Sequence, residues 1–250
     1  MERARIRRGA SILPSLFTTG NLFLGFWSII KTLDGRFGEA APLVGAAVVL
    51  DILDGRIARL TNTQSEFGAQ YDSLADVISF GVAPALLVYR WGFEAVPRAG
   101  WLAAFLFLVC GALRLARFNV QKHVVDGRYF VGLPIPAAAG QVAAVVWLLP
   151  DPLEGHLLAV LAAVAVVALA LLMVSTLRYP SFKNVDLRRR RSYINVLGIA
   201  LLFLLIALHP TSMLLGLATA YSLSAPVMYL VGMLRRRADA PPAPPAAVAG

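Results

Sequence analysis

The 250-residue sequence has little charge, one cysteine and three histidines. Charged residues make up 15% of the chain and hydrophobic residues 58%, whereas about a quarter of a typical soluble domain is charged. The mean hydropathy is +0.71. The shortage of charge argues against a soluble domain and favours an all-α polytopic membrane protein.

The scarce cysteine and histidine residues exclude two further kinds of chemistry. Cys110 lies alone inside an apolar run, so no disulfide can form within the chain. The histidines, at His123, His156 and His209, are scattered near segment ends and show no ligand spacing. Neither a zinc site nor a histidine base is therefore expected.

Long apolar segments dominate what is present. Each has about 17–25 residues, the length that a helix needs to cross a bilayer. We expect one helical bundle of about eight transmembrane helices, with a six-helix core and a C-terminal helical hairpin that turns around His209 and Pro210. The eight segments cover approximately 13–33, 39–60, 70–90, 99–119, 132–150, 156–177, 193–209 and 211–234.

The net charge of +9 comes from basic residues at the ends of the apolar segments. This placement is typical of topology signals and of contact with anionic membrane lipid, and no nucleic-acid partner is expected. With the N-terminus inside, 19 Lys and Arg residues are cytoplasmic and 4 lie on the other side. The positive-inside rule thus predicts that both termini and the acidic residues described next lie on the cytoplasmic side. We expect an integral protein of a bacterial or archaeal cytoplasmic membrane.

We expect three regions along the chain. Residues 1–183 are expected to form the transmembrane core. Residues 184–237 contain a basic linker and two additional spans. Residues 238–250 are rich in proline and alanine and are predicted to form a disordered tail.

Four aspartates lie within the 26-residue stretch DILDGRIARLTNTQSEFGAQYDSLAD. Asp51 and Asp54 are three residues apart and Asp72 and Asp76 are four apart, so each pair shares one face of a helix. The short polar segment 60–70 predicts two antiparallel neighbouring helices whose carboxylates converge. Carboxylates at membrane depth are costly, and one or two divalent cations with oxygen ligands would compensate them.

The neighbours of these aspartates suit a phosphate ligand. Gly55, Ala58 and Gly68 leave the helix surface bare, so that a bulky group can approach the backbone. Arg59 offers the planar donor fork that matches phosphate. These residues together predict a nucleotide or diphosphate site at the membrane surface. The alternative, aspartates that only pair with arginines, does not explain the glycines or the spacing.

The combined pattern is Asp51-x-x-Asp54-Gly55-x-x-Ala58-Arg59, eight residues, then Gly68-x-x-x-Asp72-x-x-x-Asp76. It resembles the complete signature of the CDP-alcohol phosphotransferases. The resemblance implies that two Mg²⁺ or Mn²⁺ ions are bound by Asp51, Asp54 and Asp72. Asp76 would also touch the metal site and act as general base. The cytidine diphosphate pocket would be lined by Gly55, Ala58, Arg59 and Gly68, and a homodimer is implied as well.

Four other stretches resemble membrane-type (class I) phosphatidylserine synthases, a branch of this family, and the resemblance covers about residues 12–183. The stretches are 14–21, 111–120, 130–136 and 172–183. The first places Thr18 and Asn21 on one helix face and implies that both join the CDP-lipid site. It has Ser15 where asparagine is usual. The alternative for these two polar side chains is hydrogen bonding inside the bundle.

A serine acceptor brings a carboxylate that needs a cation. Arg114, Arg117 and Asn119 end the fourth span at the predicted depth of the aspartates, and the two arginines can face one way. Together with Lys183 they are the candidate serine-binding residues. The alternative is that the arginines extend towards lipid headgroups.

The resemblance implies that CDP-diacylglycerol and L-serine react to give phosphatidylserine and CMP, with the acyl chains entering sideways from the bilayer. Within the family, another acceptor (glycerol 3-phosphate or inositol phosphate) or an archaeal ether-lipid donor remains an alternative. A cation transporter that uses the aspartates as its path is an alternative of a different class, and it predicts acids at mid-membrane and broken half-helices.

Overall fold

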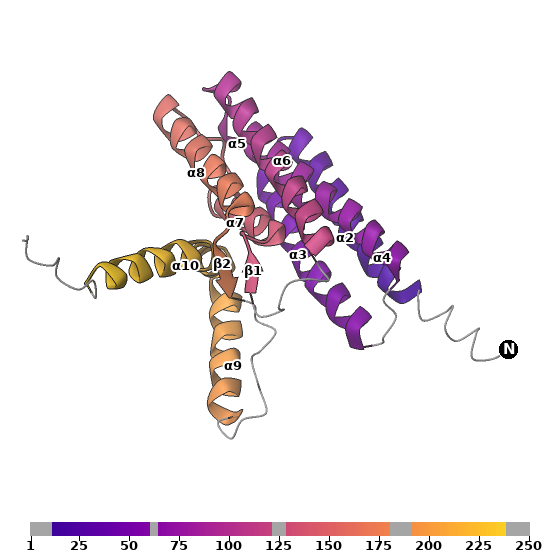
Figure 1. Ribbon diagram of the computed structural model, residues 1–250. Helices are drawn as coiled ribbons and strands as arrows, with labels where there is room; N and C mark the ends of the chain where they lie inside the picture. Colours follow the sequence, from indigo (N-terminus) through magenta and orange to yellow (C-terminus); the bar gives the residue numbers. More distant parts are fainter. Residues whose placement is uncertain (1–11, 61–64, 122–128, 181–191, 239–250) are drawn as a thin grey trace, which may run out of the picture.

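The computed structural model describes residues 12–60, 65–121, 129–180 and 192–238, and these are helical almost throughout (Figure 1). One short two-stranded antiparallel sheet is the exception. The elements are α2 (Ile12–Leu33), α3 (Phe37–Leu60), α4 (Glu66–Asp76), η1 (Val77–Val82), α5 (Ala83–Gly92), α6 (Pro97–Gln121), β1 (Tyr129–Val131), α7 (Ile135–Leu148), α8 (His156–Val174), β2 (Arg178–Pro180), α9 (Ser192–Leu208) and α10 (Pro210–Ala238).

The eight predicted segments correspond to continuous helical stretches, because α4, η1 and α5 run without a break from Glu66 to Gly92. Within the described residues, four stretches are long and apolar enough to cross a membrane. They are Glu66–Gly92, Pro97–Val120, His156–Val174 and Pro210–Leu234. The prediction of an integral all-α membrane protein with several spans is confirmed.

The third span begins several residues earlier than predicted. Ser65 caps α4, since its side chain accepts a hydrogen bond from the Gly68 amide at 3.0 Å. A serine cap satisfies one of the free amides at a helix start, which allows the polar residues that follow to remain helical. The cap thereby sets the first residue of the helix that carries Asp72 and Asp76.

A π-helical turn, η1, directly follows Asp76. Turns of this type are rare and occur often at functional sites. Ser79 in this turn donates a hydrogen bond to the backbone carbonyl of Asn21 on α2 at 3.0 Å. Gly25 permits this close approach, because a Cβ atom there would lie 2.4 Å from Ser79 Oγ and 2.7 Å from Ser79 Cα.

Packing around α2 determines how the acidic helices are placed. α2 packs against α3, α4, η1 and α5, whereas α3 and α4 make few direct contacts with each other within the described residues. The predicted antiparallel pair is therefore held together by α2, with little interface of its own. This arrangement leaves the last turns of α3 separate from the first turns of α4.

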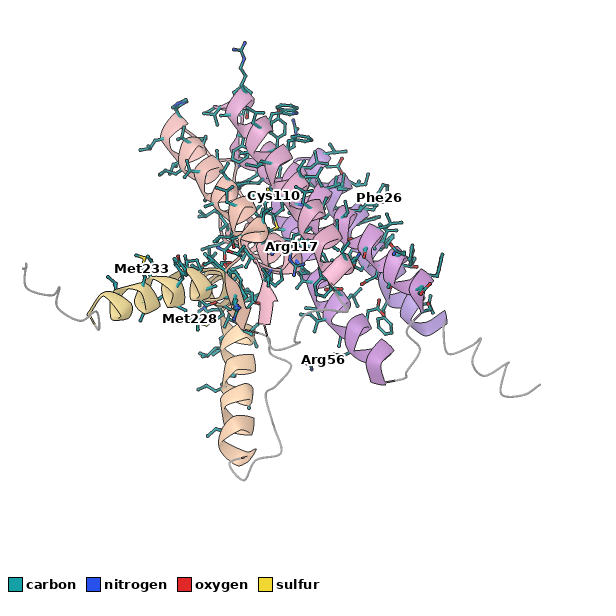
Figure 2. The ribbon with its side chains drawn as sticks, viewed as in Figure 1. Phe26, Arg56, Cys110, Arg117, Met228 and Met233 are labelled. Atoms are coloured by element: carbon teal, nitrogen blue, oxygen red, sulfur yellow. The ribbon has the colours of Figure 1, made fainter. Side chains whose placement is uncertain are left out.

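Small residues fill the centre of the bundle. Ala40, Ala83 and Ala138 are fully buried, as expected where helix backbones approach each other closely in a membrane protein. Cys110 is also buried, whereas Phe26 on α2 points away from the bundle (Figure 2). An exposed Phe26 fits a surface that faces lipid.

The two strands were not predicted from the sequence. β1 and β2 pair antiparallel, with Phe130 opposite Tyr179. Gly132 follows β1 with a φ of +77°, and its amide donates to the Leu177 carbonyl at 2.8 Å. The sheet thus joins the start of α7 to the end of α8.

The two C-terminal helices are connected by a tight turn at His209, as predicted. Figure 1 shows that they diverge from this turn rather than lie side by side. α10 packs its first half against α7 and contacts β2, which directs it away from α9. Met228 and Met233 lie on its far half, outside the bundle (Figure 2).

Candidate active site

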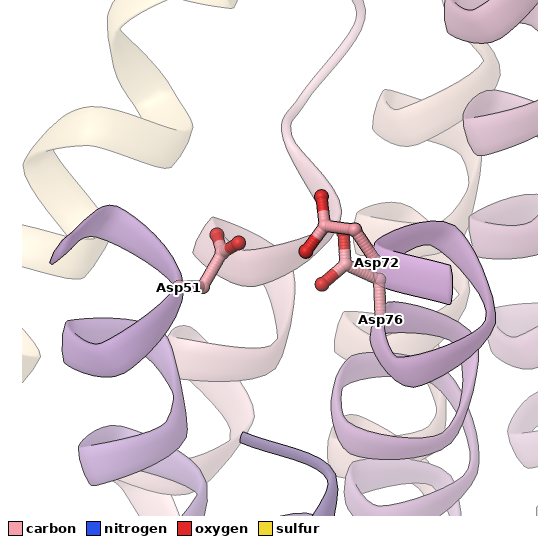
Figure 3. A group of neighbouring side chains, drawn as sticks. All are labelled: Asp51, Asp72 and Asp76. Carbon is pink, nitrogen blue, oxygen red and sulfur yellow. The ribbon is translucent and has the colours of Figure 1, made fainter. Parts of the chain in front are cut away.

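Three aspartates from two helices meet at one point. Asp51 of α3 and Asp72 and Asp76 of α4 each offer a carboxylate oxygen, and these oxygens all lie within 4.8 Å of one another (Figure 3). The spacing of four residues places Asp72 and Asp76 on the same face of α4. The two helices run in opposite directions, so the end of α3 comes level with the start of α4.

Asp54 lies outside this group of three. Its carboxylate accepts a hydrogen bond from the Thr18 hydroxyl on α2 at 2.5 Å. Asp54 is buried, and its other oxygen, Oδ1, has no hydrogen-bond partner in the described part of the chain. Thr18 therefore holds one oxygen of Asp54 and leaves the second available to a ligand.

Asn21 is the second polar residue of the α2 opening, and it contacts another of the aspartates. Its side-chain nitrogen donates to Asp76 at 3.5 Å, and the side chain is almost completely buried. Thr18 and Asn21 were both predicted to lie in the CDP-lipid site. The structure places each of them directly against an aspartate of the signature.

Arg114 on α6 is the cation that faces the carboxylates. Its guanidinium interacts electrostatically with Asp51 and Asp76, and it lies over the Phe118 ring at 5.7 Å from the centroid. The side chain is only 9% exposed, and its Nε has no hydrogen-bond partner among the described residues. A buried guanidinium with a free donor suits a carboxylate or phosphate ligand.

The other predicted serine-binding residues lie differently. Arg117 donates to the Val174 backbone carbonyl at 3.5 Å, at the end of α8. Asn119 donates to Ser73 Oγ at 2.8 Å and so ties α6 to α4. Lys183 lies outside the described residues.

The predicted lining of the cytidine diphosphate pocket is described in part. Gly55 is exposed near the end of α3, and the Gly68 amide is used in the cap of α4. The backbone of Ala58 and Arg59 belongs to α3, but their side chains lie outside what the structure describes.

Sequence reasoning missed three residues close to the aspartates. Ser73 and Ser79 lie on α4 and η1 and bond to Asn119 and to the Asn21 carbonyl. Tyr221 on α10 interacts electrostatically with Arg114. The serines could have been found from their position beside the aspartates, but no sequence pattern relates Tyr221 to them.

The residues present fit a divalent cation. The carboxylates of Asp51, Asp72 and Asp76 form an all-oxygen donor set within the reach of one ion, and Asp54 adds a buried oxygen without a partner. Arg114 interacts electrostatically with two of these carboxylates, those of Asp51 and Asp76. Carboxylates gathered at membrane depth are costly, and a bound divalent cation would lower that cost.

Comparison with known proteins agrees with this geometry. A family model described as CDP-alcohol phosphatidyltransferase matches residues 11–176. A Helicobacter pylori (strain ATCC 700392 / 26695) protein named CDP-diacylglycerol–serine O-phosphatidyltransferase is 42% identical over 216 residues, which cover 85% of this chain and 90% of that protein. A Bacillus subtilis (strain 168) protein of the same name is 33% identical over 172 residues, or 69% of this chain and 92% of that protein. A third, from Methanocaldococcus jannaschii, is 41% identical over 157 residues, or 63% of this chain and 71% of that protein.

Proposed function

This chain belongs to the CDP-alcohol phosphatidyltransferase family, and we propose that it transfers the phosphatidyl group of CDP-diacylglycerol to L-serine, giving phosphatidylserine and CMP. The observation that carries the proposal is the cluster of three carboxylates on α3 and α4 with the buried Arg114 beside it. The names of the relatives support serine as the acceptor, since two of the matches cover at least 90% of the relative's length.

The donor is held by its diphosphate. We assign the metal-binding role to Asp51, Asp54, Asp72 and Asp76, with two Mg²⁺ or Mn²⁺ ions. Bound ions supply positive charge that neutralises the diphosphate and the CMP that leaves. Thr18 keeps Asp54 turned towards α2, and Asn21 does the same for Asp76. The cytidine would lie along the bare surface formed by Gly55, Ala58, Arg59 and Gly68.

The acceptor is activated at Asp76. Its carboxylate accepts the proton of the serine hydroxyl while the serine oxygen forms a bond to the phosphorus that carries diacylglycerol. The bond from this phosphorus to the bridging oxygen of CMP breaks, and CMP leaves with the electron pair. Arg114 binds the serine carboxylate and orients the hydroxyl, and this positioning supplies much of the rate because a carboxylate is a weak base.

The reaction faces the cytoplasm in this proposal. The distribution of 19 basic residues on one side and 4 on the other supports a cytoplasmic N-terminus, and the ends of α3 and α4 that carry the aspartates lie on that same side. CMP is then released into the cytoplasm, while the acyl chains remain in the bilayer. A homodimer is the assembly that we propose.

A single assay tests the reaction. Purified protein with Mn²⁺ or Mg²⁺, CDP-dioleoylglycerol and labelled L-serine should release CMP and form labelled phosphatidylserine in equal amounts. Glycerol 3-phosphate and inositol phosphate are offered in parallel, and a product with either but not with serine would overturn the assignment. Asp76→Asn should abolish CMP release, whereas Asp34→Asn, an exposed position beyond α2, should retain it.

A further inference from the structure

α10 is fastened to the bundle by specific polar contacts. The side-chain nitrogen of Gln141 on α7 donates to the Thr219 hydroxyl of α10 at 3.0 Å, and this hydroxyl lies 3.3 Å from the Gln141 side-chain oxygen, to which it can donate. Tyr179 of β2 donates its hydroxyl proton to the Ser222 backbone carbonyl at 3.0 Å. Burial, with a smaller contribution from Tyr221, raises the pKa of Tyr179 to about 12. The hydroxyl therefore stays protonated and remains a hydrogen-bond donor. The first half of α10 is therefore a fixed part of the bundle.

This half of α10, together with α5, α7 and α8, lines a cavity of about 250 Å³. Eleven of the fifteen lining residues are alanine, valine or leucine, so the walls are almost wholly apolar. Along α8 the lining extends from Leu172 to Ala162, ten residues or about 15 Å of helix. The cavity is thus long as well as apolar, a form that suits an extended hydrocarbon chain.

The cavity opens towards the outside of the bundle. Ala165 and Ala168 line it and are exposed, and Leu223 on α10 is 51% exposed. These residues lie on α8 and α10, two helices long and apolar enough to span a membrane. A lipid chain could therefore enter sideways from the bilayer without crossing water.

One polar atom in the cavity wall is left unsatisfied. Ser222 is only 4% exposed, and its Oγ has no hydrogen-bond partner in the described part of the chain. The other polar lining groups have partners, since Trp91 donates to the Leu149 carbonyl at 2.7 Å and Gln141 pairs with Thr219. A water molecule would need two to four polar partners, so this wall favours an apolar ligand with one hydrogen-bond acceptor.

The Ser222 end of the cavity adjoins the candidate active site. Tyr221, the preceding residue, packs against Tyr179 with ring centroids 5.6 Å apart and interacts electrostatically with Arg114. Arg114 in turn faces Asp51 and Asp76. Ser222 is therefore one residue along α10 from Tyr221, and its backbone carbonyl is bound by Tyr179, so this part of the cavity is connected to the candidate active site through the two tyrosines.

We propose that this cavity binds one acyl chain of the CDP-diacylglycerol donor, with the Ser222 hydroxyl donating a hydrogen bond to the ester carbonyl of that chain. The inference rests on the proposed function and goes beyond it, because it assigns α10 to substrate binding. It also predicts a preference for ester over ether lipids, since an ether oxygen replaces the carbonyl acceptor. The end of the cavity near Ala162, which we call the deep end, would hold the part of the acyl chain farthest from the glycerol.

Two donors that differ only in this linkage test the hydrogen bond. Initial rates of CMP release are measured with CDP-dioleoylglycerol and with its dialkyl ether analogue. Ser222→Ala should raise the KM for the ester donor about three- to tenfold and leave the KM values for the ether donor and for serine unchanged. An equal effect on both donors, or no effect on either, would overturn the role of Ser222.

A steric test addresses the chain itself. Ala162→Phe fills the deep end and should raise the KM for the dioleoyl donor about tenfold, with little change for a dihexanoyl donor. Val164→Phe adds a ring to the exposed face of α8 outside the cavity and is the matched control. Equal KM values for Ala162→Phe and wild type would overturn the cavity as the chain site.

A binding measurement separates this inference from the proposed reaction. Retention of CDP-dioleoylglycerol by wild type, Ser222→Ala and Ala162→Phe is measured by native mass spectrometry without serine. Weaker retention by both variants supports the site even if wild-type protein releases no CMP with serine, in which case the proposed function alone fails. Equal retention by all three proteins would overturn the site.

Discussion

The side-chain nitrogen of Asn21 on α2 lies 3.5 Å from a carboxylate oxygen of Asp76 on α4. The backbone carbonyl of the same asparagine accepts a hydrogen bond from Ser79, in the π-helical turn that follows Asp76. Gly25 makes the second contact possible by letting α2 approach Ser79 closely. Asn21 is thus connected to the candidate general base both directly and through the turn behind it.

Removing the side-chain contact should slow the reaction. In Asn21→Ala we expect kcat to fall about tenfold or more, because a hydrogen bond to a charged group contributes about 1.5–3 kcal/mol. The KM values for donor and serine should change little. Ser28→Ala is the matched control, since Ser28 lies on the same helix but donates to the Ala40 carbonyl away from the aspartates. A similar fall in kcat in both variants would contradict a specific role for Asn21.

Metal removal should affect stability with a predictable sign. Without a divalent cation, the carboxylates of Asp51, Asp72 and Asp76 repel one another, so the metal-free protein should unfold at a lower temperature than with Mn²⁺. Asp51→Asn removes one charge. It should raise the unfolding temperature of the metal-free protein by about 2–4 °C for each kcal/mol gained, and it should reduce the increase that Mn²⁺ produces.

Thermal unfolding in one detergent, with and without chelator, checks this prediction without any catalytic turnover. Asp34→Asn removes a carboxylate at a site beyond the end of α2 and should leave the response to Mn²⁺ unchanged. If metal-free Asp51→Asn unfolds below the metal-free wild type, repulsion among the aspartates does not limit stability.

Substitutions of the two arginines at the end of α6 should have different effects on the KM for serine. Arg114 is buried and faces the aspartates, whereas Arg117 bonds to the Val174 carbonyl. Arg114→Ala should raise the KM for serine about tenfold to a hundredfold, the loss expected for one ion pair with good geometry. Arg117→Ala should change it much less. Equal KM increases would place the serine carboxylate between them, and no change in either would remove both from the serine site.

Much of the site could be predicted because its information is local. The spacing within the aspartate stretch determines which carboxylates share a helix face, and a helix reproduces that relation reliably. The same periodicity predicted a shared helix face for Thr18 and Asn21, whereas their assignment to the CDP-lipid site came from the family resemblance. What spacing could not give is the partner across helices, so the contact between Thr18 and Asp54 and the exclusion of Asp54 from the group of three appear only in the structure.

Long-range pairings account for the features that were missed. β1 and β2 are three residues each and are separated by the whole of α7 and α8, so no local pattern predicts their pairing. Tyr221 follows Arg114 by more than a hundred residues, and the two interact electrostatically across helices because α10 packs on α7. The splayed turn between α9 and α10 has the same origin, since the choice of α7 as a partner is tertiary information.

The same sheet leads to a prediction about a single glycine. Gly132 has a φ of +77°, and a Cβ atom at this position would lie 2.3 Å from the Met173 carbonyl oxygen. Both the backbone conformation and the space exclude a side chain, so Gly132→Ala should destabilise the protein by about 2 kcal/mol or more. Gly140→Ala lies on α7 with nothing within 4 Å and should instead be neutral or stabilising by up to about 1 kcal/mol. Unfolding temperatures of the two variants in the same detergent check the contrast, and equal stability would show that the approach of Gly132 to the end of α8 is not required for the fold.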